Sequence, residues 1–139
     1  MARADKITQT QKVIETFSDF LTNFDKSPMT DDLGRVTNES AIKTRVKNLI
    51  LTNLGERPFN SSIGSNVVKS LFEPYTSFTA DDIKEAIKHT LKFNEPSVEV
   101  LNVDVIGDAN QNSVRVNIVF YIINNPTAIS IDVILKRVR

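Results

Sequence analysis

The stretch SVRVNIVFYIINNPTAISIDVILK, residues 113–136, decides the fold. Apolar side chains occupy every second position in both of its halves, a period that is typical of β-strands with one buried face. In the second half these residues are Ile129, Ile131, Val133 and Leu135. The first half also carries apolar residues on its other face, so we expect it to be a central strand covered on both faces. The sequence NNPT, residues 124–127, predicts the turn between the two strands.

A third strand is predicted just before this stretch, over residues 98–106. Val98 and Val100 share one parity, whereas Leu101, Val103 and Val105 share the other. This change of phase predicts a β-bulge or a sharp twist near Val100. Because GDANQN, residues 107–112, has the composition of a hairpin loop, the three strands are expected to form an antiparallel meander.

Helical periodicity dominates residues 37–94. Thr37 or Asn38 is expected to cap a helix that Gly55 ends, and a short helix is expected over residues 66–72. Thr79 is expected to cap a third helix, with acidic residues in its first turn and NEP, residues 94–96, at its end. The expected buried residues of the first and third helices are Ile42, Val46, Leu49, Ile50, Ile83, Ala86, Ile87, Thr90 and Leu91.

The N-terminal part is less regular. Apolar residues at helical spacing over residues 13–24 indicate a possible amphipathic helix, although FSDFLTNF, residues 17–24, is equally compatible with an extended chain. Residues 25–38 are rich in turn formers and indicate a surface loop. We therefore expect an N-terminal arm over residues 1–36 and an α+β domain over residues 37–139. In that domain the N-terminal helices are expected to pack on one face of a C-terminal antiparallel three-stranded β-meander.

Composition narrows the classes of function. The 139 residues carry 17 basic and 17 acidic side chains, so the chain lacks the basic excess of nucleic-acid-binding proteins. The absence of cysteine excludes disulfides and thiolate metal sites. The first twenty residues contain no continuous apolar stretch, so we expect no signal peptide, and the longest apolar runs elsewhere are too short for a membrane span. We expect no cofactor and no membrane partner.

The residue types that carry enzyme chemistry form no recognisable pattern. His89, the single histidine, is expected on the exposed side of the third helix, as a solvated residue rather than a base. Two carboxylates would suffice for glycoside hydrolysis, but no spacing selects a pair among Glu56, Glu73, Glu95, Asp81 and Asp104. The four glycines form no phosphate-binding motif. The basic ending, Lys136, Arg137 and Arg139, is typical of charges that protect a strand end or pair with another protein.

Two segments combine charged residues with prolines and aromatics. Residues 55–74, GERPFNSSIGSNVVKSLFEP, place Glu56 and Arg57 in a loop, and KFNEPSVEV places Glu95 and Pro96 between a helix and a strand. Such residues can form an internal ion pair that fixes the loops, or a surface that binds a partner. The sequence leaves both alternatives open.

The block AIKTRVKNLILTNLGERPFNSSIGSNVVKSLFEP, followed by a helix, NEP and a β-meander, resembles the sheath-initiator baseplate wedge proteins of contractile-tailed bacteriophages. The resemblance covers residues 32–139. It implies a non-enzymatic subunit of the virion's tail baseplate, assembled in the host cytoplasm, which lies near the tail tube and contacts wedge core proteins and the tail sheath protein. Related subunits occur in type VI secretion and bacteriocin baseplates, which remain an alternative. Some members carry a lysozyme-like label, so a peptidoglycan hydrolase is a further alternative.

The family's hallmark is a Glu-Pro-Arg motif after the last helix, which the resemblance associates with contact to the wedge core. Here it is Glu95-Pro96-Ser97, and a serine hydroxyl cannot replace a guanidinium. Arg57 or Arg115 is expected to substitute if either lies close in space. We therefore assign the wedge-core contact to Glu95, Pro96, Arg57 and Glu56.

The final strand is the expected contact with the tail sheath. A strand with an unpaired edge can bind an incoming strand through main-chain hydrogen bonds. The strand also completes the domain's own sheet, and both roles are compatible because a strand has two edges. The residues assigned to the sheath contact are Ile129, Ile131, Val133, Leu135, Lys136 and Arg137.

Overall fold

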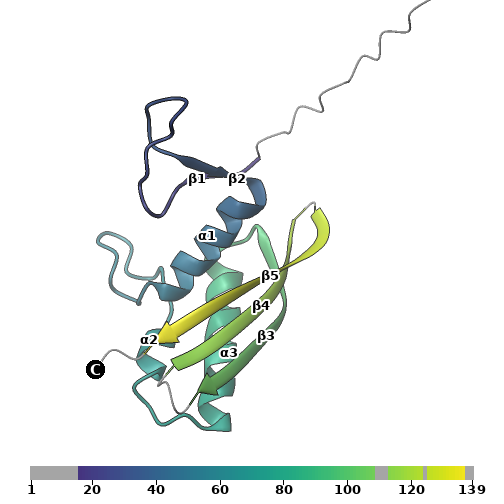
Figure 1. Ribbon diagram of the computed structural model, residues 1–139. Helices are drawn as coiled ribbons and strands as arrows, with labels where there is room; N and C mark the ends of the chain where they lie inside the picture. Colours follow the sequence, from purple (N-terminus) through teal and green to yellow (C-terminus); the bar gives the residue numbers. More distant parts are fainter. Residues whose placement is uncertain (1–15, 109–112, 124, 137–139) are drawn as a thin grey trace, which may run out of the picture.

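The structure is a computed structural model that describes residues 16–108, 113–123 and 125–136. In chain order, its elements are β1 (Ser18–Phe20), β2 (Arg35–Thr37), α1 (Asn38–Leu51), α2 (Val67–Ser70), α3 (Ser77–Asn94), β3 (Val98–Asp108), β4 (Ser113–Ile122) and β5 (Asn125–Lys136). The last three strands form an antiparallel sheet in the order β3-β4-β5. Figure 1 shows α3 running along this sheet with α1 beside it. None of the described helices is long and apolar enough to span a membrane.

The hydrophobic core lies between the helices and one face of the sheet. Ile42, Val46 and Ile50 of α1 and Ile83 and Ile87 of α3 are fully buried. They pack in one cluster with inward-facing residues of the strands, among them Val116, Ile118, Phe120, Ile129, Val133 and Leu135. The fold class predicted from the sequence, helices on one face of a three-stranded meander, is therefore confirmed.

The strand predictions are confirmed except for the outer face of β4. The register shifts between Val100 and Asn102, where the phase change predicted a bulge, and β4 is the central strand. Its outer face is not covered, however, because the described helices lie on the opposite face. Val119 and Tyr121 are half-buried, and Ile123 is 53% exposed. Residues 107 and 108 continue β3 rather than beginning the loop, and residues 109–112 lie outside the described part.

The helix ends differ from their predicted positions. α1 ends at Leu51, because Thr52 adopts an extended conformation while its hydroxyl donates to the Asn48 carbonyl at 2.7 Å. α3 begins two residues before Thr79, because the Thr76 hydroxyl accepts the Thr79 N–H at 3.2 Å and so caps the helix. Asp81 and Asp82 consequently lie beyond the first turn. The prediction that acidic residues of the first turn interact with the N-terminus of this helix is therefore wrong.

The N-terminal segment is extended where the structure describes it. Residues 13–15 of the possible helix lie outside the described part, and residues 18–20 form β1, which pairs with β2 inside the predicted surface loop. Phe20 and Phe24 are 50% and 69% exposed, so their helical spacing does not produce a buried face. Asn38 joins this hairpin to α1: its Oδ1 accepts the Thr16 N–H at 2.9 Å, and its N–H donates to the Phe17 carbonyl at 2.7 Å. The division at residue 36 stays a prediction.

Candidate interaction surfaces

Glu95 is buried at the junction between α3 and β3. Its N–H donates to the Leu91 carbonyl at 2.9 Å and so closes the last turn of α3. Its side chain is 10% exposed, and its Oε1 accepts the Ser97 hydroxyl at 2.6 Å. Nη1 of Arg45 lies 3.6 Å from the same oxygen. Ser97, which stands where the resemblance predicts an arginine, therefore binds the glutamate two residues before it.

Arg45 is the cationic partner of Glu95 that sequence reasoning missed. It projects from the middle of α1, outside the stripe of buried residues predicted for this helix, and its guanidinium lies 5.8 Å from the centre of the Phe17 ring. Fifty positions separate it from Glu95, and no local pattern indicates their contact. The arginine expected to substitute from β4, Arg115, is exposed and lies opposite Ile106, whereas β3 begins opposite Ile122, at the other end of the sheet.

Arg57 does lie near Glu95. The two residues help to line a pocket of about 370 Å³ between the hairpin, α1, the loop after α1 and the end of α3. Arg57 is exposed, and within the described residues it forms no salt bridge. Pro96 is also exposed, whereas Glu56 accepts the Asn53 N–H at 2.8 Å and braces its own loop. Of the four predicted wedge-contact residues, Arg57 and Glu95 line this pocket, whereas Glu56 and Pro96 do not.

The loop that carries Arg57 is closed at its base. Ser65 donates its N–H to the Thr52 carbonyl at 2.8 Å and its hydroxyl to the Ile50 carbonyl at 2.6 Å. Gly64 has φ +131°, and a Cβ placed there would lie 2.7 Å from the Thr52 oxygen. Only glycine fits this close approach of the two backbones. The loop is therefore fixed to the end of α1, which gives Arg57 a defined position.

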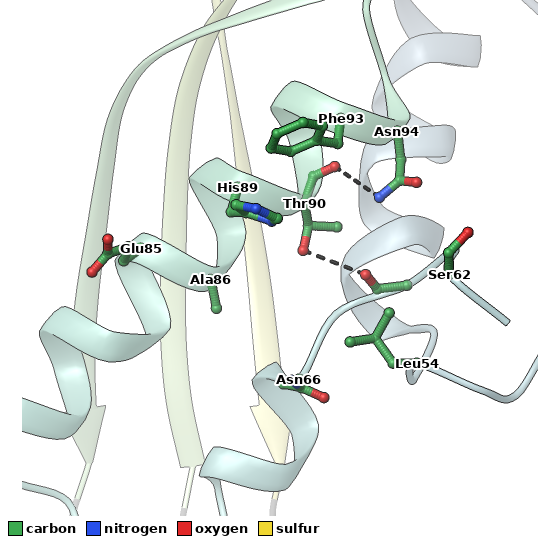
Figure 2. A pocket seen from close by; sticks show the side chains of 10 residues that line it. Leu54, Ser62, Asn66, Glu85, Ala86, His89, Thr90, Phe93 and Asn94 are labelled. Atoms are coloured by element: carbon green, nitrogen blue, oxygen red, sulfur yellow. Dashed lines mark hydrogen bonds between the residues drawn. The ribbon is translucent and has the colours of Figure 1, made fainter.

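A second pocket, of about 670 Å³, lies between α3 and this loop (Figure 2). His89 lies on its α3 side, exposed, with its ring centre 4.4 Å from that of Phe93. The Thr90 hydroxyl donates to the Gly64 carbonyl at 3.4 Å and links the helix to the loop. Among the described residues, no group of three or more histidine, aspartate or glutamate side chains gathers here or elsewhere. Ser62 also lines the pocket, and its hydroxyl donates to Asn60 Oδ1 at 2.8 Å, so in the described contacts neither hydroxyl of the lining is bonded to His89.

The predicted sheath-contact residues of β5 divide between core and edge. Ile129, Val133 and Leu135 are buried and Ile131 is half-buried, so these side chains face the helices. Lys136 is exposed, and residue 137 lies outside the described part. Among the described strands β5 pairs with β4 alone, and no other described backbone group bonds to its outer edge. What β5 can offer a partner is mainly this backbone edge.

An outer contact of β3 shows which residues of β5 face the edge. Tyr75 donates its hydroxyl to the Val105 carbonyl at 3.3 Å, so this carbonyl points away from β4. Val105 lies opposite Val116, which lies opposite Val133. Because peptide groups alternate in direction along antiparallel strands, Val116 and Val133 bond to each other. The residues of alternate parity in β5 therefore direct their N–H and C=O groups outward; among them are Ala128, Ser130, Asp132 and Ile134.

Comparison with known proteins identifies the family. The model of the GPW_gp25 family, described as baseplate wedge protein gp25, matches residues 36–127. The baseplate wedge protein gp25 of Enterobacteria phage T4 is 33% identical over 95 residues, which cover 68% of this chain and 72% of that protein.

Solved structures with low sequence identity share the fold. A protein described as a tail lysozyme from Geobacter sulfurreducens has 20% identity and a TM-score of 0.67, over 73% of this chain and 92% of that one. A chain of the anti-feeding prophage baseplate has 17% identity and a TM-score of 0.62, over 88% and 87%. A chain of the type VI secretion baseplate complex has 12% identity and a TM-score of 0.51, over 70% and 93%. The chain therefore belongs to the gp25 family of baseplate wedge proteins, and it is a structural subunit of the baseplate of a contractile tail.

Proposed function

We propose that this subunit initiates the tail sheath by adding a strand of the first sheath subunit to the outer edge of β5. The observation that carries the proposal is that, among the described strands, β5 pairs with β4 and has no neighbour on its other side. Pro126 lies at the start of β5, but the edge from Ala128 to Lys136 carries no proline and has no partner among the described strands. Such an edge would be an aggregation hazard if it had no role. Addition of a strand uses this edge, because the main chain supplies affinity and alternate side chains supply specificity.

The edge of β3, on the other side of the sheet, is less accessible to an added strand. The Tyr75 hydroxyl donates to the Val105 carbonyl on the edge of β3. A Cβ placed on Gly107 would lie 2.5 Å from the Tyr75 ring, so the ring lies against the strand. β3 also carries the bulge between Val100 and Asn102. Covering residues and bulges both hinder strand addition. We infer that β5 is the edge that remains open to the sheath.

The pocket around Glu95 is our proposed contact with the wedge core. Arg57 supplies an exposed guanidinium without a salt bridge in the described part, and it lines the same pocket as Glu95. Pro96, which follows Glu95 in the chain, is exposed. A guanidinium in such a position can bind a carboxylate of a partner with two hydrogen bonds. The ion pair of Glu95 and Arg45, in which Glu95 is buried, would then hold the pocket in shape rather than contact the partner. In this proposal Glu95 and Arg45 form the internal ion pair that the sequence allowed, and Arg57 belongs to the partner surface.

A proline at residue 130 tests the proposal. Ser130→Pro removes one outward N–H without removing a bond to β4, so the domain is expected to fold. Ser130→Ala is the matched control, because it removes only the side-chain hydroxyl. We expect baseplates with Ser130→Pro to assemble tubes without sheath in electron micrographs, and those with Ser130→Ala to assemble normal sheath. Normal extended sheath on Ser130→Pro baseplates would contradict the proposal. Deletion of the strand is a poorer test, since it removes buried residues of the core.

The peptidoglycan hydrolase alternative rests on one observation, namely that Asp19 and Glu95 line the same pocket. Glycoside hydrolysis needs two carboxylates on either side of a sugar. Here Glu95 Oε1 is already bonded to Ser97 and faces Arg45. Such contacts favour a structural role, so we propose that the subunit is not an enzyme. A zymogram with the full chain distinguishes a peptidoglycan hydrolase from a subunit without enzymatic activity.

A further inference from the structure

A groove lies along the open edge of β5. It has a volume of about 240 Å³ and is lined by Lys43, Thr44, Lys47, Ile131, Asp132 and Val133. The lining includes residues of α1 and β5 and none of β4 or α3, so the groove lies on the side of β5 away from β4. Ile131 is half-buried while its inward-facing neighbours Ile129 and Val133 are buried. The groove therefore exposes part of Ile131 at the position where an added strand would run beside β5.

The wall that α1 contributes to this groove is positively charged. The ammonium of Lys43 is bound to Glu39 at 2.7 Å, four residues before it on the same helix. Lys47, one turn further along, is exposed and forms no salt bridge with any residue in the described part. Asp132 also lines the groove, but its carboxylate points to the outer face of the sheet, where it accepts a hydrogen bond from Asn117 at 2.9 Å. Within the described part of the chain, Lys47 is thus a cation without a bound acid, beside the edge of β5.

The geometry points to an acidic side chain on the strand that pairs with β5. We propose that this strand, which the proposed function assigns to the sheath subunit, carries an aspartate or glutamate that enters the groove and pairs with Lys47. Successive side chains of an added strand alternate between the two faces of the sheet. Those on the inner face would lie under α1, next to Ile131, with Lys47 at the rim. The inference deepens the proposed function and depends on it.

An opposite charge at this point would also select the partner. Charges at the rim of an interface act mainly on the rate of association and on the rejection of wrong partners. A strand with a lysine or arginine at the same position would meet Lys47 and be disfavoured. The backbone edge alone binds any extended chain, so this lysine would supply selectivity that the main chain lacks.

The test measures the affinity of the full chain for the sheath protein of the same particle, at several salt concentrations. We expect Lys47→Ala to weaken binding about two- to fivefold. Lys47→Glu should weaken it about tenfold, with a smaller dependence on salt than the wild type. Lys88→Glu is the matched control, because Lys88 is exposed on α3 and does not line the groove. It should bind like the wild type.

Two outcomes separate this inference from the proposed function. If Lys47→Glu binds as tightly as Lys88→Glu while Ser130→Pro abolishes binding, the acidic side chain is refuted and strand addition at β5 stands. If Ser130→Pro binds like the wild type, strand addition fails and this inference fails with it. Circular dichroism of each variant shows that it is folded before its affinity is compared.

Discussion

Replacing Arg45 by methionine should destabilise the subunit through the buried carboxylate that it leaves behind. Unit charges 3.6 Å apart attract each other by about 4–5 kcal/mol at an effective dielectric constant of about 20. The cost of removing Glu95 from water offsets part of this energy. Removing one partner of a fully buried pair costs about 3–5 kcal/mol, and an exposed pair contributes at most about 1 kcal/mol. Because Glu95 is 10% exposed and Arg45 is 36% exposed, we expect an intermediate loss of about 2 kcal/mol.

Thermal unfolding of the purified chain measures this loss. At roughly 4 °C per kcal/mol for a domain of this size, Arg45→Met should lower Tm by about 8 °C. Arg45→Lys keeps the charge and should lower Tm by about half as much as Arg45→Met. Combining Arg45→Met with Glu95→Gln removes the uncompensated charge, so the double variant should be more stable than the sum of the single changes predicts. A Tm for Arg45→Met within about 1 °C of the wild type, or strict additivity, would refute the role assigned to this pair.

Two further predictions concern the loop and the enzyme alternative. Gly64→Ala should lower the free energy of unfolding by about 2 kcal/mol or more in a denaturant titration, because its Cβ would meet the Thr52 oxygen and φ is +131°; an unchanged unfolding midpoint would show that the loop is not held closed at Gly64. A zymogram with the full chain should show no clearing of peptidoglycan, and clearing that Glu95→Gln abolishes would restore the hydrolase alternative.

The sheet was predictable from the sequence because its signal is local and strong. The alternation in residues 114–122 and 129–135 reflects a single buried face, and it correctly placed the central strand and the final strand. The bulge near Val100 was visible as a change of parity. The prediction that β4 is covered on both faces was wrong, because apolar residues on the outer face of a strand do not require a second layer of helices.

Features that depend on tertiary contacts were not predictable. β1 and β2 are three residues each, too short for a periodic signal, and they pair across the segment that the sequence presents as a loop. Arg45 has the pattern of a solvated helix residue, and its contact with Glu95 exists only because the end of α3 packs beside α1. Which peptide groups of β5 face outward follows from the contact between Tyr75 and Val105, which the sequence does not reveal.

Hydrogen exchange at the outer edge of β5 tests the central claim most directly. The amides of Ser130, Asp132 and Ile134 should exchange rapidly in the free subunit and become protected when the sheath protein binds, because an added strand supplies their missing acceptors. The amides of Ile131 and Val133, which bond to β4, should be protected in both states. Binding of the sheath protein that leaves Ser130, Asp132 and Ile134 exchanging as fast as before would contradict strand addition at this edge.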